Sequence, residues 1–321
     1  MNEASPARLK VAIAQIAPVW LRREPTVAKV AEWVRKAAAE GARLVAFGES
    51  LVPGYPFWVE HTDGARFESA LQKDFFAHYA TESVVLERGD LDAVRGAALE
   101  GGIFVVLGII ERAAERGGHS LYCTLVTIDN FGEIVNTHRK LMPTYEERLV
   151  WSAGDGLGLR TFELAPFRLG SLNCYENWMP LARAALYGQG EDLHVASWPG
   201  NLRNTEDLTR HMAREGRSYV LSASALLRRE HVHDALPHAR LLRERLPDVP
   251  ANGGSCIAAP DGSWLVAPVV DEERLLLAEL DPAAVLRERQ AFDPVGHYAR
   301  PDVLELTVRR ARPSGLRIEG D

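Results

Sequence analysis

Three reactive side chains stand at comparable places in this sequence: Glu49, Lys140 and Cys174. Each follows a short apolar run of the kind that forms a buried strand. Open α/β sheets bind their ligands at the carboxyl ends of the strands, so we expect these side chains at one sheet edge. The polar segment around Cys174, Asn-Cys-Tyr-Glu-Asn, is unlike the surroundings of a packed core thiol. The pattern therefore predicts a chemical site.

The three residue types have complementary chemistry. A thiol with an ordinary pKa near about 8.5 is a weak nucleophile at neutral pH. The Glu49 carboxylate could accept the Cys174 proton. The Lys140 ammonium could stabilise the negative charge that appears when the thiolate attacks a carbon bonded to nitrogen. Taken singly, Glu49 and Lys140 are more often strand-end surface charges. Together with Cys174 they favour covalent catalysis.

The other metal-binding or nucleophilic candidates are weaker. Cys123 and Cys256 lie within plain apolar strand patterns, and we interpret both as structural thiols. The cysteine spacing matches no zinc-finger pattern. His231, His233 and His238 could together contact a metal, although a solvated polar loop is the favoured interpretation. The sequence contains no phosphate-binding G-x-x-x-x-G-K-[ST] loop and no H-E-x-x-H zinc helix.

Composition narrows the class of protein. The 321 residues are 46% hydrophobic and 25% charged, with a net charge of −7. A mildly acidic chain argues against a general nucleic-acid binder. No apolar run approaches the roughly 18 residues that span a bilayer, which predicts no membrane partner. The first ten residues lack the apolar core of a signal peptide, and only three cysteines are present. We therefore expect a cytoplasmic location.

Strand-like and helical patterns alternate along one continuous α/β domain, predicted to span residues 1–308. Residues 309–321 lose apolar periodicity and are expected to form a loose tail, and 228–254 reads as a long loop. Helices are predicted from Pro25 to Gly41 and at 180–187 and 206–216. Strands are predicted at 11–16, 44–47, 103–110, 121–128, 134–137, 167–172, 193–198 and 219–223, with a hairpin formed by 255–259 and 264–268.

At these residues the sequence resembles the nitrilase branch of the carbon–nitrogen hydrolase superfamily. The similarity runs from about Lys10 to Asp302, with several motifs in the family's order. They are Phe-Gly-Glu-Ser at 47–50 with Val-Pro-Gly-Tyr-Pro at 52–56, His-Arg-Lys-Leu-Met-Pro-Thr at 138–144, Glu147 with Arg148, Gly-Asp-Gly at 154–156, Asn-Cys-Tyr-Glu-Asn-Trp-Met-Pro-Leu at 173–181, Glu-Gly-Arg at 215–217 and Gly-His-Tyr-Ala-Arg-Pro-Asp at 296–302.

The resemblance implies a four-layer α-β-β-α sandwich that works with no metal and no organic cofactor. It assigns Cys174 as nucleophile, Glu49 as general base and Lys140 as the group that stabilises developing negative charge. It also implies that Glu147 positions Lys140 and the substrate. An ordinary surface charge beside Arg148 is the alternative interpretation of Glu147.

The implied substrate is an organic nitrile, hydrolysed to a carboxylic acid and ammonia through a covalent cysteine adduct. Nitrilases usually carry Trp directly after the cysteine, whereas this chain has Tyr175. An amidase or N-carbamoyl hydrolase using the same residues is therefore the alternative. A scaffold protein without activity is disfavoured because all three reactive residues are present. We expect aromatic side chains to line the pocket, with Tyr55, Tyr175 and Trp198 as candidates.

The resemblance also implies that subunits pair, as a homodimer or a larger homo-oligomer. The helix predicted at 180–187 directly follows the nucleophile segment, in the region through which the family commonly pairs. Its small residues Ala182, Ala184 and Ala185 are expected to permit close approach of a second helix.

Overall fold

The computed structural model describes residues 8–312, which form two β-sheets and their covering helices. The first sheet contains β1 (Leu9–Gln15), β2 (Leu44–Ala46), β3 (Phe104–Arg112), β4 (Leu121–Ile128), β5 (Ile134–Arg139) and β13 (Arg274–Leu280). The second contains β6 (Phe162–Leu164), β7 (Phe167–Asn173), β8 (Leu193–Trp198), β9 (Tyr219–Ser224), β10 (Leu226–Leu227), β11 (Ala251–Ala258) and β12 (Trp264–Val270).

The α-helices are α1 (Arg23–Ala39), α2 (Trp58–His61), α3 (Ala70–Glu82), α4 (Asp92–Gly101), α5 (Pro180–Tyr187), α6 (Leu202–Gly216), α7 (Ala239–Arg245) and α8 (Pro282–Arg289). Short 3₁₀ turns are η1 (Leu86–Arg88), η2 (Ala114–Arg116), η3 (Tyr145–Leu149), η4 (Gly156–Gly158), η5 (Cys174–Trp178) and η6 (Arg229–His231). Across residues 8–312, no helix combines the length and the apolarity that a membrane span requires.

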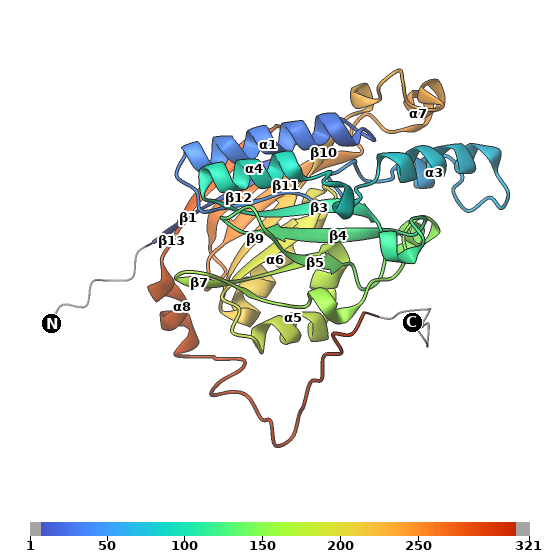
Figure 1. The fold of residues 1–321 in the computed structure, drawn as a ribbon. Helices are drawn as coiled ribbons and strands as arrows, with labels where there is room; N and C mark the ends of the chain where they lie inside the picture. Colours follow the sequence, from blue (N-terminus) through green and yellow to red (C-terminus); the bar gives the residue numbers. More distant parts are fainter. Residues whose placement is uncertain (1–7, 313–321) are drawn as a thin grey trace, which may run out of the picture.

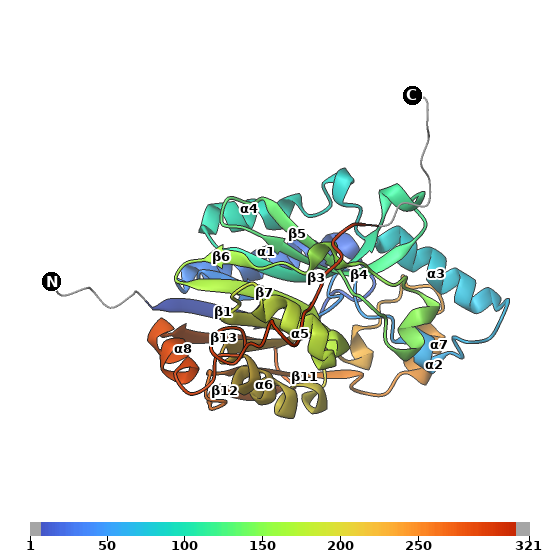
Figure 2. The ribbon, with the colours of Figure 1, turned by 90° about the horizontal axis from the view of Figure 1, so that it is seen from below.

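The layers follow the predicted α-β-β-α order. The first sheet has the strand order β13-β1-β2-β3-β4-β5, and α1 and α4 lie side by side on its outer face (Figure 1). The second has the order β10-β11-β9-β8-β7-β6, with β12 paired to β11. Figure 2 shows α5 and α6 on the side of the molecule away from α4. The predicted sandwich is therefore confirmed.

Strand alternation creates the separate cores between these layers. Successive side chains of a strand point to opposite faces of its sheet. On β1, Val11 and Ile13 enter the core between the two sheets, whereas Ala12 packs under α1 and α4. On β8, Val195 enters the intersheet core and Trp198 points toward α6. The central strands of both sheets, such as β4 and β8, are thus buried on two faces, which explains their nearly continuous apolar runs.

Elements with strong periodic patterns have the expected positions. The strands at 121–128 and 193–198 and the helix at 180–187 have the predicted bounds. The helix predicted to begin at 206 instead begins at Leu202, capped by the Asn201 side chain. The sequence analysis missed α3, α4, α8 and β13; α3 buries only Phe75 and Tyr79, too few residues to make an apolar stripe.

The segment expected to be a long loop contains a helix, and the first residues of the expected tail, which form no helix or strand, contact the domain. The excursion at 228–254 carries α7, whose Leu242 is fully buried in one cluster with Trp58. In the expected tail, Arg310 donates to the Leu159 carbonyl at 3.0 Å, and Arg312 pairs with Asp155 at 2.9 Å. These contacts attach 309–312 to the domain because each arginine meets a fixed acceptor. Residues 313–321 of that predicted tail lie outside the described residues.

Gly108 on β3 allows two backbone segments to touch. A Cβ atom at this position would lie 2.4 Å from the Gly48 carbonyl oxygen and 2.6 Å from the Glu49 Cα atom. Because both atoms belong to the backbone, the segment around Glu49 would have to move. We expect Gly108→Ala to lower the free energy of unfolding by about 1–3 kcal/mol, measured by urea denaturation.

Gly96 on α4 provides the matched control, because a Cβ there has nothing within 4 Å. Gly96→Ala should be neutral or should stabilise the protein by up to about 1 kcal/mol. Equal urea midpoints for the two variants would contradict this account of Gly108.

Candidate active site

Three strand ends deliver the predicted residues to one place. β2 is parallel to β3, while β4 is antiparallel to β3 and β5 is antiparallel to β4. β5 therefore runs in the direction of β2, so Glu49 and Lys140 emerge at the same edge of the first sheet. Cys174 directly follows β7 in the second sheet. The site lies where these edges of the two sheets meet.

Backbone contacts join the two sheets next to Glu49. The Glu49 N–H donates to the Trp198 carbonyl at 3.0 Å, and the Ser197 hydroxyl donates to the Phe47 carbonyl at 3.0 Å. A Cβ at Gly48 would lie 2.7 Å from the Ala225 nitrogen, so glycine permits this approach. The position of Glu49 is consequently set by the second sheet as well as by its own strand.

The structure brings the four predicted catalytic residues together. The Lys140 Nζ atom lies 2.8 Å from Glu49 Oε1 and 2.7 Å from Glu147 Oε2. Carboxylate oxygens of Glu49 and Glu147 and the Cys174 sulfur lie within 4.8 Å of one another. All four side chains are buried. The lysine ammonium thus has two carboxylate partners, as a charge inside a protein requires.

Glu147 is a buried group and not a surface charge. Its Oε2 accepts from the Thr144 N–H at 2.6 Å as well as from Lys140, and its Oε1 accepts from the Tyr55 hydroxyl at 3.0 Å. Thr144 and Glu147 form a capping box at the start of η3. These contacts hold the carboxylate against Lys140, which fits the expected positioning role.

The Cys174 thiol is held protonated in the free protein. Burial raises the pKa of Cys174 well above its usual range, the nearby Glu49 charge raises it further, and Lys140 opposes them. The Tyr175 backbone N–H also opposes the rise in the pKa of Cys174. Cys174 itself has a φ of +43°, a left-handed conformation that costs a non-glycine residue about 1–3 kcal/mol. The turn therefore presents a neutral thiol, which needs a base to react.

Glu49 has the properties of such a base. Burial raises the pKa of Glu49 to about 7; Lys140 opposes this shift, and the charge of Glu147 adds to it. A proton acceptor is most effective when its pKa lies near the working pH. Glu49 can therefore accept a proton from Cys174 and return it near neutrality.

Glu176, which the sequence analysis did not assign to the site, joins the cysteine and lysine segments. Its carboxylate accepts from the Asn173 N–H at 2.8 Å, from the Leu141 N–H at 2.6 Å and from the His138 ring at 3.1 Å. These three residues flank Cys174 and Lys140 in the chain. The spacing Asn-x-x-Glu at 173–176, typical of a helix-capping box, is the signal that could have identified it.

A cavity of about 280 Å³ opens onto Cys174. Tyr55 and Tyr175 line it as predicted, whereas the Trp198 side chain is fully buried and donates to the Ser222 hydroxyl at 3.4 Å on the α6 side. The lining side chains and backbone belong to Tyr55, Phe57, Glu60, Thr144, Tyr145, Glu146, Glu147, Cys174, Tyr175, Pro199, Gly200, Asn201, Arg203, Asn204 and Pro250. Strand alternation turns Trp198 away, and the residues that follow it form the wall instead.

The predicted histidines do not form a metal-binding group in the part of the chain that the structure describes. Over the described range, 8–312, the group of His, Cys, Asp and Glu side chains close enough to share an ion is Glu49, Glu147 and Cys174. The Lys140 ammonium already bonds to both carboxylates of that group, so it supplies the cation there. His238 pairs separately with Asp74 at 2.8 Å, away from any such group.

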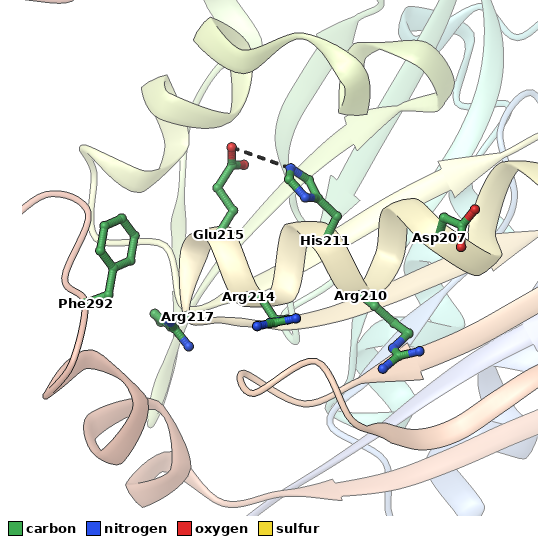
Figure 3. A pocket seen from close by; sticks show the side chains of 7 residues that line it. All are labelled: Asp207, Arg210, His211, Arg214, Glu215, Arg217 and Phe292. Atoms are coloured by element: carbon green, nitrogen blue, oxygen red, sulfur yellow. Dashed lines mark ion pairs between the residues drawn. The ribbon is translucent and has the colours of Figure 1, made fainter.

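A second hollow, of about 690 Å³, lies on the outer face of α6 (Figure 3). It is lined by Asp207, Arg210, His211, Arg214, Glu215, Arg217 and Phe292, and includes none of the predicted catalytic residues. Glu215 connects this face to α5, because it pairs with Arg183 at 2.5 Å and accepts from the Tyr187 hydroxyl at 3.0 Å.

A buried thiol, carboxylate and lysine at the joined edges of an α-β-β-α sandwich fit the class of hydrolases that act on carbon–nitrogen bonds. The carbon–nitrogen hydrolase family model matches residues 10–290, and the chain belongs to that family. Its relatives place it in the nitrilase branch. It is 38% identical to a nitrilase from an unknown prokaryotic organism, covering 96% of this chain and 95% of that one.

Other comparisons agree. The chain is 40% identical to a nitrilase from Pseudomonas syringae pv. syringae, covering 93% and 89% of the two chains, and 37% identical to an aliphatic nitrilase from Sinorhizobium fredii, covering 94% and 96%. A Saccharomyces cerevisiae member of branch 10 of the nitrilase superfamily has the same fold, with a TM-score of 0.70, 19% identity, and coverage of 92% and 99%.

Glu176 provides a test of how the site is held. Although its burial opposes ionisation, His138 and the two backbone donors lower the pKa of Glu176. Glu176→Gln would place an amide among donors, leaving hydrogen bonds unmade at a cost of about 1–3 kcal/mol. We expect circular dichroism to show a lower thermal midpoint for Glu176→Gln than for the parent.

The exposed Glu163 on β6 is the control, because Glu163→Gln should change stability by no more than about 0.5 kcal/mol. A thermal midpoint of Glu176→Gln equal to the parent's would contradict the role of Glu176 in joining the two segments.

Proposed function

We propose that this protein is a nitrilase that hydrolyses a small organic nitrile to the carboxylic acid and ammonia. The observation that carries the proposal is the buried cluster in which Lys140 bonds to Glu49 and Glu147 beside Cys174. Relatives that are named nitrilases and share most of the chain's length support it.

In the first half of the reaction, Glu49 takes the Cys174 proton as the sulfur attacks the nitrile carbon. The new carbon–sulfur bond forms as one carbon–nitrogen π bond breaks, and the nitrogen is protonated to give a thioimidate. Lys140 and the Tyr175 backbone N–H stabilise the negative charge on that nitrogen as it develops. Because the thiol is neutral at rest, attack requires that Glu49 accept its proton.

In the second half, Glu49 activates a water that adds to the thioimidate carbon. Proton transfer to nitrogen then expels ammonia and leaves a thioester on Cys174. A second water, also activated by Glu49, breaks the carbon–sulfur bond, releases the carboxylic acid and returns the proton to the thiol. Glu147 keeps Lys140 in place through both halves.

The cavity supports a small substrate with an apolar organic group. Tyr55, Phe57 and Tyr175 contribute aromatic surface near Cys174, and Pro199 and Pro250 add apolar wall. We infer that Tyr55 and Tyr175 contact the organic group. Trp198 is not included, because its indole lies in the core under α6.

An amidase or N-carbamoyl hydrolase remains the alternative, because Tyr175 follows the cysteine and an amide would form the same thioester. The distinguishing experiment measures ammonia release from nitriles and from their matching amides under identical conditions. Turnover of the nitriles supports the proposal, and turnover of the amides alone overturns it in favour of the alternative.

The nucleophile is tested by removing its sulfur. Cys174→Ala should abolish turnover, because no covalent intermediate can form, while Cys256→Ala should retain most of it. Intact-mass spectrometry with a slow substrate should show an adduct in the parent protein, mapped by digestion to the peptide that holds Cys174. An adduct on Cys123 or Cys256 would refute the assignment.

We further propose a cytoplasmic enzyme that works as a homodimer or a larger assembly. The start of α5 and the turn before it expose the apolar side chains of Trp178, Met179 and Leu181. The expected role of Ala182 and Ala185 is not supported: both are buried against this subunit's own core, so a charge at Ala185 would damage the fold. Leu181, with 68% of its surface exposed, is the appropriate position to test.

Leu181→Lys should shift the mass measured by light scattering toward that of a single 35.5 kDa chain, because the lysine would place a charge in the apolar contact. Leu99→Lys is the matched control, since Leu99 is 58% exposed on α4, on the opposite side of the molecule. If both variants keep the parent's mass, α5 is not the interface.

A further inference from the structure

Cys123, which looked like an ordinary packed thiol in the sequence, contacts the general base. Its side chain is only 1% exposed, and its Sγ atom lies 3.5 Å from Glu49 Oε1, with the thiol as donor. The two residues are 74 positions apart in the chain. The contact exists because β4 and the end of β2 belong to the same sheet.

β4 contacts two of the charged residues of the site, Glu49 and Lys140, through Cys123 alone. The Cys123 carbonyl accepts a hydrogen bond from the Lys140 N–H at 2.8 Å, while its thiol faces Glu49. Lys140 then reaches back to Glu49 Oε1 at 2.8 Å. Cys123 therefore closes a small ring of contacts through Glu49 and Lys140.

The two oxygens of Glu49 have different surroundings. Oε1 has two donors, the Lys140 ammonium and the Cys123 thiol, whereas Oε2 is buried and has no hydrogen-bond partner among the described residues. Donors on one oxygen restrict rotation of the carboxylate. They leave Oε2 as the atom free to accept the proton of Cys174.

We propose that Cys123 is a positioning residue for Glu49, whose thiol hydrogen bond orients the carboxylate and keeps its proton-accepting oxygen free for Cys174. This rests on the proposed role of Glu49 as general base. Cys123 performs no covalent step of its own.

Two further facts agree with this role. Burial and the Glu49 charge raise the pKa of Cys123 well above its usual range, so the thiol keeps its proton and remains a donor. Lys140 and the Cys123 hydrogen bond both stabilise the ionised form of Glu49, against burial and the Glu147 charge. The charged and titratable groups that interact electrostatically with Glu49 include Lys140, Glu147, Cys123, Cys174, Tyr55 and Tyr79.

Removing the thiol donor should therefore shift the pH dependence of the reaction. A hydrogen bond to an ionised carboxylate lowers its pKa, so its loss raises the pKa of Glu49. The acid limb of kcat/KM then moves to higher pH, and the rate falls most where Glu49 becomes protonated. A cysteine that served packing alone would change stability or the overall rate without moving that limb.

The experiment measures kcat/KM for a nitrile against pH in Cys123→Ala, Cys123→Val and Cys123→Ser. The two apolar variants should lose about threefold to tenfold at about pH 6 and much less in alkaline solution, since a thiol is a weak donor. Cys123→Ser supplies a stronger O–H donor in place of the thiol, so its acid limb should lie below the parent's. Circular dichroism establishes that each variant is folded.

Cys256 provides the matched control. It is a fully buried thiol in the second sheet that donates to the Thr209 hydroxyl at 3.5 Å, away from Glu49. Cys256→Ala and Cys256→Ser should keep the parent's pH profile.

An unmoved acid limb in either folded apolar variant would overturn the proposal, as would an equal shift in Cys256→Ala. If neither apolar variant folds, Cys123→Ser provides the test. Its stronger O–H donor should move the acid limb to lower pH, and an unmoved acid limb would refute the positioning role of Cys123. Failure of the proposed function can be distinguished from failure of the Cys123 proposal, because in the first case the parent protein itself would turn over no nitrile.

Discussion

The buried ammonium of Lys140 is the group on which the rest of the site depends. A single charge without a partner in a protein interior is destabilising by several kcal/mol. Here two carboxylates, Glu49 and Glu147, each lie within 3 Å of the ammonium. The ends of β2 and β5 and the start of η3 must therefore converge, and the cavity forms where they do.

The same arrangement affects the protonation state of Cys174, the proposed nucleophile. Two carboxylates and one ammonium leave a net negative charge beside Cys174, which is itself buried. A thiolate there would add a second negative charge in a medium of low polarity, so the thiol keeps its proton until substrate arrives. Burial is the largest cause of the raised pKa of both Glu49 and Cys174, and the charge of Glu147 adds to each.

A wider set of polar contacts connects the elements around the site. Glu176 ties the Cys174 turn to the segment after β5, and Arg139, the neighbour of Lys140, pairs with Glu111 on β3 at 2.5 Å. Arg183 on α5 pairs with Glu215 on α6 behind the nucleophile turn. The contacts of Glu176 and Arg139 join the segments that carry Cys174 and Lys140 to other elements, and the Arg183–Glu215 pair joins α5 to α6. These buried polar contacts therefore fix the relative positions of the segments, which apolar packing alone would hold less specifically.

The sequence by itself determined the residue types, their order and the strands that carry them. Apolar alternation and Gly, Pro or Asn boundaries are local signals, which is why β4, β8 and α5 have their predicted limits. The same signals placed Glu49, Lys140 and Cys174 directly after strands. The sequence did not indicate the helix α3 or the contacts of residues 309–312 with the domain, because both segments have weak apolar periodicity.

Only the tertiary structure decided which side chains meet. Trp198 follows the same strand signals as the catalytic residues, yet alternation turns its ring toward α6 and away from the cavity. Cys123 and Cys256 look alike in the sequence, but sheet order brings one to Glu49 and the other to Thr209. Ala185 faces its own core, and Glu176 bridges two segments. Such pairings depend on strand order, facing and burial, which arise only when residues far apart in the chain pack together.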